Sequence, residues 1–231
     1  MMRVTLLALC VALGGCAATD VRKDPEAQLT AAANYGGLIQ LYKSQLSQQP
    51  DQPQLLLKLA RSYYLNHDLE SAQFYLSHLS DLGSDLPEQY LLQGKIHGDR
   101  QQYQAAYLNY QKAEQRGLTE SELALRQGVA LAQLKRFDEA ERAFNLARLR
   151  GHDEVAVKNN LAMLQMQQGH YQQAVALLEP VYRAHPDVPQ VQANLALSLV
   201  KNHQLEQARR LLASLYPQQP LAPLIQQLQQ L

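Results

Sequence analysis

The chain has 231 residues, and its 21 lysine and arginine residues balance its 21 aspartate and glutamate residues, so the formal net charge is zero. Such a balance lacks the electrostatic footprint of a nucleic-acid-binding domain or of a polybasic membrane-binding surface. The sequence has two cysteines, Cys10 and Cys16, and the first lies in a predicted signal peptide. With one cysteine left, we expect the processed chain to form neither an internal disulfide nor a cysteine-based metal site.

Residues 1–15 predict a signal peptide. Arg3 precedes an apolar run over residues 4–13, which is too short to cross a bilayer as a stable helix but fits the hydrophobic part of a signal. The run ends in the sequence Leu13-Gly14-Gly15-Cys16, which resembles the bacterial lipobox. This resemblance implies that Cys16 becomes the first residue of the processed chain and carries a covalent lipid.

The lipid would fix where the protein is found. Several acyl chains hold a protein at a membrane stably, whereas one chain is marginal. Ala17 follows in place of the Asp that signals inner-membrane retention in similar enterobacterial lipoproteins, so the resemblance implies the periplasmic face of the outer membrane of a Gram-negative bacterium. Residues 16–27 are then the lipidated cysteine and a short tether with a typical span of about 20 Å. The alternative is an ordinary secretory signal, cleaved near Ala12, which leaves Cys16 free.

A 34-residue period runs through the rest of the chain. Its most regular member is an alanine, at Ala72, Ala106, Ala140, Ala174 and Ala208. Large apolar or aromatic residues stand three positions before and four positions after each alanine, which makes an amphipathic helical stripe. Twelve positions before each alanine stands a small residue, which lets two helices cross closely: Ala60, Gly94, Gly128, Ala162 and Ala196.

A 34-residue repeat of paired helices is the signature of the tetratricopeptide (TPR) solenoid. One helix pair cannot bury both of its apolar faces, so neighbouring pairs must stack into a continuous core. We therefore predict an all-α fold, a right-handed superhelix of helix pairs in a TPR domain over residues 28–231. Its five full repeats are expected at about 53–86, 87–120, 121–154, 155–188 and 189–222.

Signals for helix starts follow the same period. A capping residue is expected before the first helix of each repeat, at Asp51, Asp85, Thr119, Asp153 and Asp187. Four of these have Glu or Gln three positions later, at Gln54, Glu88, Glu122 and Gln190, which is the spacing of a capping box. Prolines in the first turn of the same helices are tolerated, because the missing N–H would have no helical partner there: Pro53, Pro87 and Pro189.

Both ends of the solenoid are expected to be capped. Residues of about 28–48 keep the phase of the repeat around Leu38 and predict a half repeat made of one second helix. After Pro220 the chain is amphipathic and rich in glutamine, which predicts a C-terminal capping helix, since end repeats need a polar outer face.

The first helices of the repeats are expected to line a concave groove with their second, fifth, sixth, ninth, twelfth and thirteenth residues. The predicted protein-binding residues are Leu57, Arg61, Tyr64, Leu91, Lys95, Leu125, Val129, Asn159, Asn160, Met163, Met166, Asn194, Leu197 and Val200. The groove is expected to be largely apolar, which suits an amphipathic helix or an extended apolar peptide. It could also be filled by the C-terminal helix of the chain or by a second copy.

Two asparagines at matching groove positions, Asn160 and Asn194, have two interpretations. An amide both donates and accepts hydrogen bonds, so the pair could form a ladder for the backbone of a bound peptide. Alternatively, each could satisfy backbone groups of its own helix or face solvent.

The sequence does not indicate an enzyme. Its seven histidines have none of the spacings of a metal-binding helix, and no phosphate-binding loop or nucleophile elbow occurs. We therefore expect no catalytic residue, no metal, no small-molecule substrate and no cofactor apart from the covalent lipid on Cys16. The expected partners are proteins, with no nucleic acid, and contact with the membrane is expected only through the lipid.

A lipobox followed by about five TPRs resembles the TadD-like TPR lipoproteins of the tight-adherence (Tad, Flp pilus) system. The resemblance is carried by residues 171–180 and by two strings, Asn159-Asn160-Leu161-Ala162 and Ala193-Asn194-Leu195-Ala196-Leu197. It implies an adaptor in the assembly of the pilus apparatus that binds the secretin or another pilus-assembly component. The alternatives are a pilotin-like lipoprotein of type IV pili and a TPR adaptor for peptidoglycan hydrolases or outer-membrane protein assembly.

Overall fold

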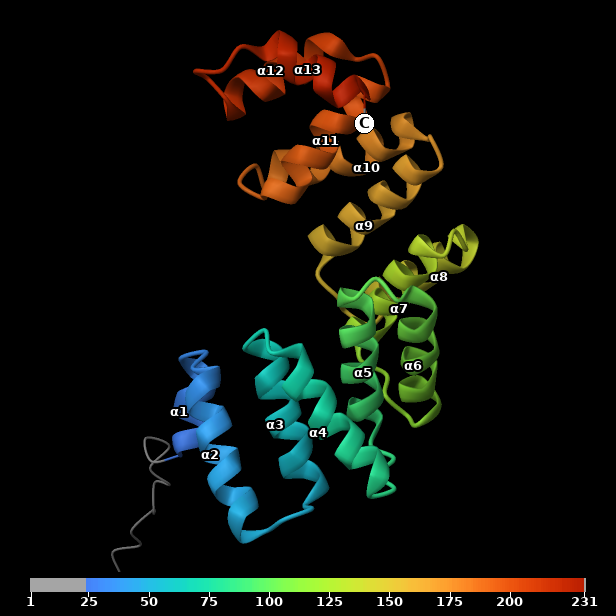
Figure 1. Ribbon diagram of the computed structural model, residues 1–231. Coiled ribbons are helices and arrows are strands. Elements are labelled where there is room, and N and C mark those ends of the chain that lie inside the picture. The colour runs from blue at the N-terminus through green and yellow to red at the C-terminus, as the bar shows by residue number, and fades with distance from the viewer. Residues whose placement is uncertain (1–23, 231) are drawn as a thin grey trace, which may run out of the picture.

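The computed structural model describes residues 24–230, so the predicted signal peptide, Cys16 and most of the tether lie outside the described residues. Within this range the chain is entirely helical, and the helices follow one another in hairpin pairs (Figure 1). They are α1 (Pro25–Ala31), α2 (Tyr35–Gln48), α3 (Pro53–Leu65), α4 (Leu69–Asp81), α5 (Pro87–Asp99), α6 (Tyr103–Gln115), α7 (Ser121–Gln133), α8 (Phe137–Leu149), α9 (Glu154–Gln167), α10 (Tyr171–Ala184), α11 (Pro189–Lys201), α12 (Leu205–Leu215) and α13 (Leu221–Gln230).

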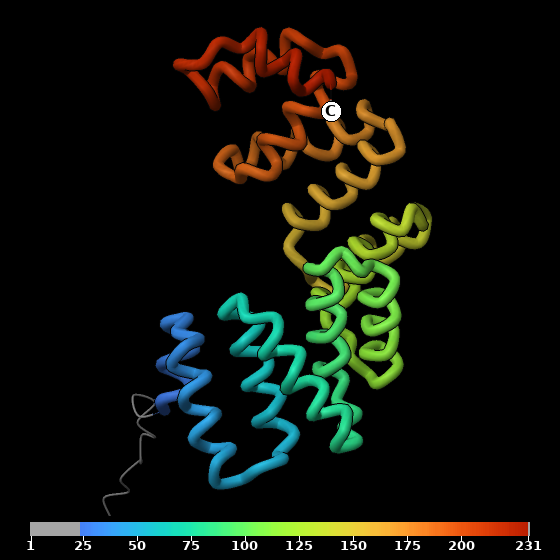
Figure 2. The backbone as a smooth tube through the Cα atoms, viewed as in Figure 1, coloured from blue at the N-terminus to red at the C-terminus, as the bar shows by residue number. Residues whose placement is uncertain are grey.

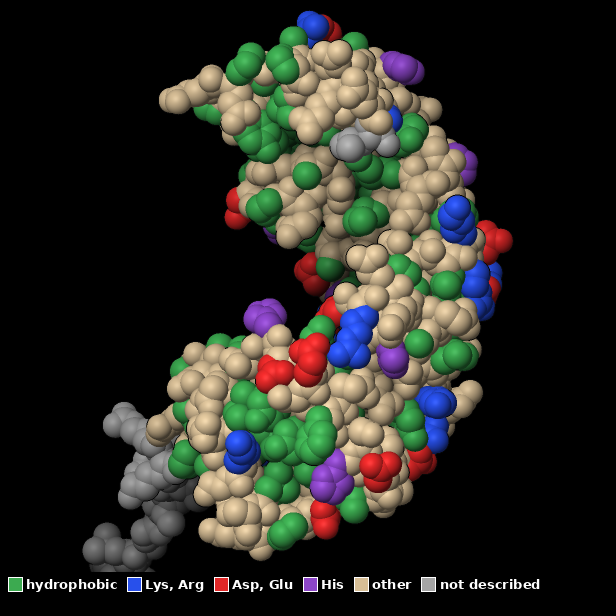
Figure 3. All heavy atoms as spheres, viewed as in Figure 1, with side chains coloured by type: hydrophobic (Ala, Val, Ile, Leu, Met, Phe, Trp, Pro, Cys, Tyr) green, Lys and Arg blue, Asp and Glu red, His purple; other side chains and the backbone are tan. Residues whose placement is uncertain are grey.

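The predicted all-α solenoid of five full repeats is confirmed. In each repeat the first, or A, helix (α3, α5, α7, α9, α11) packs against the second, or B, helix (α4, α6, α8, α10, α12). Successive A helices also contact one another, so they line the inner side of the stack. The stack curves into an arc, with α1–α4 and α11–α13 at its two ends (Figures 1 and 2), and the space-filling view shows the surface hollowed between these ends (Figure 3).

The core explains why the repeat keeps its alanines. All five periodic alanines of the B helices are 0% exposed: Ala72, Ala106, Ala140, Ala174 and Ala208. The small residues of the A helices face the B helix just as closely. A Cβ atom on Gly94 would collide with the ring of Tyr110, and one on Gly128 would lie 2.5 Å from the ring of Phe144. A larger residue at either position would therefore separate the two helices.

The expected capping residues are wrong for four of the five A helices, which are the four for which a capping box was expected. Those helices begin one residue later, after N-cap residues whose side chains make no capping hydrogen bond: Gln52, Leu86, Glu120 and Val188. Only Asp153 caps as expected, with its carboxylate accepting from the backbone N–H of Ala156 at 2.7 Å. Two of the other aspartates instead link turns to later helices: Asp51 pairs with His78 at 2.8 Å and Asp85 with Arg116 at 2.5 Å. The prolines Pro53, Pro87 and Pro189 lie in the first turn as expected.

At the N-terminal end, α2 is the B helix of the half repeat, with Leu38 and Tyr42 buried. A short additional helix, α1, precedes it and begins at Pro25, inside the stretch assigned to the tether. The half repeat is therefore a truncated pair rather than a lone helix.

At the C-terminal end, α13 packs on α11 and α12 through Ile225, which is 7% exposed. It occupies the place that the next A helix would take and so caps the solenoid. Among residues 24–230, no helix has both the length and the apolar character needed to cross a membrane.

Candidate protein-binding groove

The inner side of the arc contains two adjoining hollows near its N-terminal end. The first has a volume of about 280 Å³ and lies between α3, α5 and the start of α7. The second, of about 410 Å³, lies beside it at the ends of α3 and α5. The two share Tyr64 and Leu65, so they form one surface, which we call the inner groove. It is lined by Gln54, Leu57, Lys58, Arg61, Tyr64, Leu65, His67, Leu69, Glu88, Leu91, Leu92, Lys95, Asp99, Glu120 and Glu122.

All five predicted groove residues of the first two repeats lie together in the first hollow: Leu57, Arg61, Tyr64, Leu91 and Lys95. The first hollow combines the expected apolar lining with charge, because six of its twelve lining residues are charged. Acidic and basic side chains gather where the N-terminal repeats meet the middle of the arc (Figure 3).

One group of these charges is paired within the groove wall. The Nζ atom of Lys95 lies 2.6 Å from Oε1 of Glu122, and Nε of Arg126 lies 3.5 Å from the same oxygen. Burial alone would raise the pKa of the Glu122 carboxyl, but the hydrogen bond from Lys95 and the charges of Lys95 and Arg126 outweigh it and lower that pKa. Glu122 is therefore an anion at neutral pH, and the ammonium of Lys95 is neutralised by it.

A second pair ties the N-terminal cap to the groove. Nζ of Lys58 lies 2.7 Å from Oε1 of Glu26 in α1 and 5.8 Å from the ring centroid of Tyr42. Burial, followed by a hydrogen bond with the Glu26 carboxylate, raises the pKa of Tyr42 to about 12. The charge of Lys58 is thus held by α1 and not left for a ligand.

Tyr64 forms the boundary between the two hollows. Burial, followed by a hydrogen bond with the Asp99 carboxylate, raises the pKa of its hydroxyl to about 12. The hydroxyl is therefore neutral at physiological pH and donates to Asp99.

Four charged residues of the inner groove form no ion pair within the described part of the chain. One is a cation, Arg61, and three are anions, Glu88, Asp99 and Glu120. Their charges are free for a binding partner. The second and thirteenth positions of the repeats, which were expected to line the groove, include Glu88, Leu65 and Asp99. Glu120 lies in the turn before α7 and occupies none of the expected groove positions.

The C-terminal half of the inner side is uncharged at the predicted positions, and of the two interpretations of its asparagines the structure shows the local one at Asn160 and a bond between helices at Asn194. Nδ2 of Asn160 donates to the backbone oxygen of Ala156 at 2.8 Å, which is the local alternative. Nδ2 of Asn194 donates to Oδ1 of Asn159 at 2.9 Å and so joins α11 to α9. Met163 is 38% exposed beside this pair, with its sulfur 3.9 Å from Nδ2 of Asn159.

The remaining predicted groove residues differ in exposure. Four are partly exposed: Leu125, Val129, Met166 and Leu197. Val200 is 1% exposed and lies in the same apolar cluster as Ile225 of α13, so its assignment to the binding surface is wrong. The physical reason is that α13 covers this end of α11, as a further A helix would.

The inner groove carries no metal-binding arrangement. Over residues 24–230, no group of three or more His, Cys, Asp or Glu residues is placed to hold a metal ion. Its hydrogen-bonding groups and apolar floor suit recognition of another chain.

Comparison with known proteins agrees with this fold. Residues 91–154 match a family model described as tetratricopeptide repeat, and residues 145–212 match one described as the N-terminal TPR repeats of the surface lipoprotein assembly modifier. No curated protein sequence matches the chain.

Several solved structures are similar in shape. A chain of the APC/C hetero-tetramer Cut9–Hcn1 aligns with a TM-score of 0.71 at 15% identity, over 87% of this chain but only 40% of that one. YrrB, described as a TPR protein with an unusual peptide-binding site, gives 0.63 at 17% identity over 82% of this chain and 98% of its own. TTC0263, a thermophilic TPR protein of Thermus thermophilus, gives 0.57 at 20% identity over 75% and 95%. The chain therefore has the tetratricopeptide-repeat fold, a scaffold suited to protein–protein interaction.

Proposed function

We propose that the protein is an adaptor whose inner groove holds a segment of a partner protein. The observation that carries this proposal is the pair of adjoining hollows on α3 and α5, with an apolar floor and four charges that have no ion-pair partner among the described residues. A groove of this kind offers apolar burial together with charged groups that fix orientation. The peptide-binding site named for YrrB, a protein of the same fold, supports the same use of the scaffold.

We further propose that the adaptor is anchored through a lipid on Cys16 at the periplasmic face of the outer membrane and takes part in assembly of a Tad (Flp) pilus apparatus. The lipobox-like sequence before Cys16 supports the anchor, and the two strings around Asn160 and Asn194 support the system. The partner would then be the secretin or another pilus-assembly component.

A second candidate is the assembly of other envelope proteins. The match of residues 145–212 to TPR repeats of the surface lipoprotein assembly modifier favours this candidate. The identity of the bound partner separates the two functions, because one predicts a pilus component and the other a lipoprotein or its export machinery.

Capture of partners on purified protein variants tests the adaptor function. The Leu65→Gln variant places an amide at the wall shared by both hollows, and the double variant Met163→Glu with Leu197→Glu charges the uncharged half of the inner side. We expect Leu65→Gln and the double variant each to lose a specific envelope partner at unchanged helicity. Leu149→Glu is the matched control, since Leu149 is 80% exposed on a B helix. Equal capture by all variants would show that the inner side is not the binding surface.

A further inference from the structure

We infer that the inner groove selects a cationic amphipathic segment, one in which large apolar side chains alternate or adjoin with Lys or Arg. This inference rests on the proposed function of the groove and adds the chemistry of its occupant. It comes from the balance of paired and unpaired charges around the two hollows.

The apolar part of the recognition is set by the floor of the groove. Leu57, Leu91 and Leu92 are 9%, 7% and 5% exposed, and they line the first hollow from two successive A helices. Leu65 lines both hollows, and Leu69 lines the second. Each hollow therefore offers an apolar wall to one large side chain, and the two are close enough to take neighbouring residues of one segment.

The first hollow has equal numbers of cationic and anionic side chains, but they are not all paired with one another. The first hollow is lined by three cations, Lys58, Arg61 and Lys95, and by three carboxylates, Glu88, Glu120 and Glu122. Glu26 of α1 pairs with Lys58 at 2.7 Å, and Glu122 pairs with Lys95 at 2.6 Å and with Arg126, which lies outside the hollow, at 3.5 Å. Among the lining residues of this hollow, Arg61, Glu88 and Glu120 have no ion-pair partner in the described part of the chain.

The second hollow adds another anion. Asp99 accepts the hydrogen bond of Tyr64, but no cation pairs with it among residues 24–230. Three carboxylates thus face a ligand, against Arg61 and the one positive charge that the Lys95–Glu122–Arg126 cluster retains, so the carboxylates remain in excess. Because unpaired carboxylates in a concave, partly apolar site attract cations and repel anions, the groove favours a positively charged segment.

The placement of these anions sets the order of contacts. Glu88 and Glu120 lie at the first hollow and Asp99 at the second, so carboxylates flank both apolar sites. Positive residues on either side of the apolar pair satisfy this arrangement, whereas an acidic segment meets three repulsive contacts.

A random peptide library displayed on phage and selected on the purified full chain tests this inference. We expect enrichment of sequences in which large apolar residues adjoin Lys or Arg. The affinity of the strongest peptide, measured by fluorescence anisotropy, should fall with added salt, as expected for partly exposed charge pairs. The Glu88→Gln/Glu120→Gln variant should bind it about threefold to tenfold more weakly, since each such pair contributes modestly.

The matched control is Asp138→Asn/Glu141→Gln, which removes two exposed carboxylates near the start of α8, a B helix, and should leave affinity unchanged. If the enriched peptides show no preference for basic residues but fail to bind the Leu65→Gln variant, the charge selection is overturned and the groove remains a binding site. No enriched peptide, or binding that survives Leu65→Gln, would overturn the proposed function itself.

Discussion

At the crossing of the two helices of a repeat, the size of one side chain decides which residue fits opposite it. Where the B helix carries an aromatic residue, Tyr110 or Phe144, the A helix carries glycine. Where the B helix carries leucine at the same place, the A helix carries alanine, in the pairs Ala60 and Leu76, Ala162 and Leu178, and Ala196 and Leu212. The repeat thus keeps the summed volume at the crossing nearly constant, as close packing requires.

This pairing predicts that the effect of Gly94→Ala on stability depends on the residue at position 110. Gly94→Ala should destabilise the protein by about 1–3 kcal/mol, because the new methyl meets the Tyr110 ring. In a Tyr110→Leu background the same substitution should be neutral or stabilising. Gly98→Ala is the control, since its Cβ would lie 3.5 Å from the Tyr110 hydroxyl, an ordinary contact. Urea unfolding of the four variants measures the effect, and an equal cost of Gly94→Ala in both backgrounds would contradict the account.

The ion pair of Asp85 predicts a pH-dependent contribution to stability. Hydrogen bonds from Arg116 and from the Tyr90 hydroxyl lower the pKa of the Asp85 carboxyl, and the Arg116 guanidinium lies 4.3 Å from the Tyr90 ring centroid. Because the folded pKa is depressed, this contribution is present above the ordinary Asp pKa of about 3.9 and is lost as the pH falls through the folded value.

Asp85→Asn should therefore lower the urea midpoint at pH 7, and the difference from the natural protein should shrink as the pH is lowered below about 4. Asp138→Asn, at an exposed carboxylate with no ion pair among the described residues, should show no such trend. A midpoint difference for Asp85→Asn that stays constant with pH would rule out the ion pair as its cause.

At the scale of the helical element, the turn between the A and B helices stores backbone strain. One residue of this turn adopts a positive φ in each full repeat: His67, Gln101, Lys135, Gly169 and His203. Glycine takes this conformation without steric cost, whereas for other residues it costs about 1–2 kcal/mol. Four of the five turns therefore lack the residue that suits them best.

Gln101→Gly should stabilise the protein by about 0.5–1 kcal/mol, the relief of φ 59° being partly offset by the greater freedom of glycine in the unfolded chain. Gly169→Ala should do the reverse, and nothing lies within 4 Å of the Cβ it adds, so the backbone alone is tested. Thermal unfolding of both variants is the measurement. A stabilising Gly169→Ala would show that the turn is not strained.

The sequence predicts the helices well and the groove only in part, because the interactions that determine them act over different distances along the chain. Helix positions follow from apolar periodicity and proline, which act within one or two turns. The capping prediction fails because four A helices begin one residue after the expected caps, and two of the displaced aspartates, Asp51 and Asp85, bond instead to His78 and Arg116, 27 and 31 residues away. The same holds for the groove: Lys95 looks like a free cation in the sequence, and only the stacking of α5 on α7 reveals its bond to Glu122.

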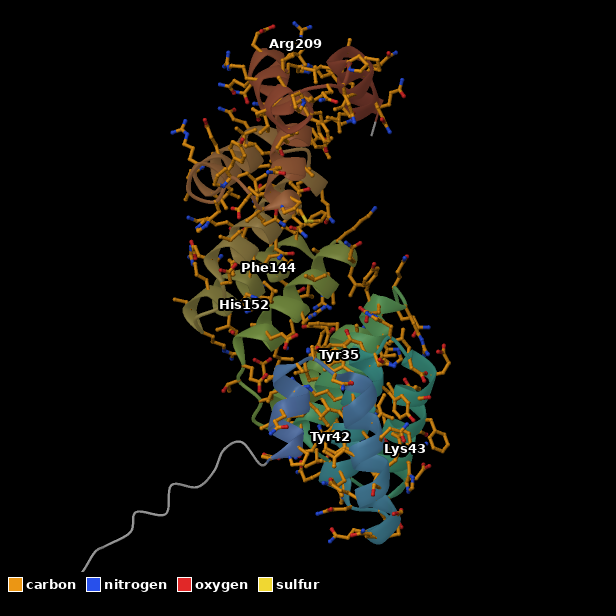
Figure 4. All side chains as sticks on the ribbon, turned by 90° about the vertical axis from the view of Figure 1, so that its left-hand side faces the viewer. Tyr35, Tyr42, Lys43, Phe144, His152 and Arg209 are labelled. Carbon is orange, nitrogen blue, oxygen red and sulfur yellow. The ribbon has the colours of Figure 1, made fainter. Side chains whose placement is uncertain are left out.

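At the scale of the whole molecule, the arc presents its A helices on the inner side and its B helices outward. Figure 4, turned by 90° from Figure 1, shows the N-terminal helices carrying Tyr42 and Lys43 at one end and Arg209 at the other. The first described residues lie at the same end of the arc as the helices that form the inner groove. A lipid on Cys16 would therefore hold this end of the arc near a membrane.

The anchor is tested by Cys16→Ser. We expect this variant to move from the membrane fraction to the soluble periplasmic fraction at unchanged helicity, because it loses the acyl chains that hold it at the membrane. Cys10→Ser, which alters the predicted signal but not the lipidation site, is the control. Full membrane association of Cys16→Ser would exclude the lipid as the anchor.

The central claim, that the inner groove holds a partner protein, is tested most directly by crosslinking in intact cells. A photo-crosslinking amino acid in place of Tyr64 stands at the boundary of both hollows, and one in place of Leu149 stands exposed on a B helix. We expect the first position to yield a defined crosslink to an envelope-assembly protein, identified by mass spectrometry, and the second to yield none. The same partner captured equally from both positions, or no crosslink from position 64, would contradict the claim.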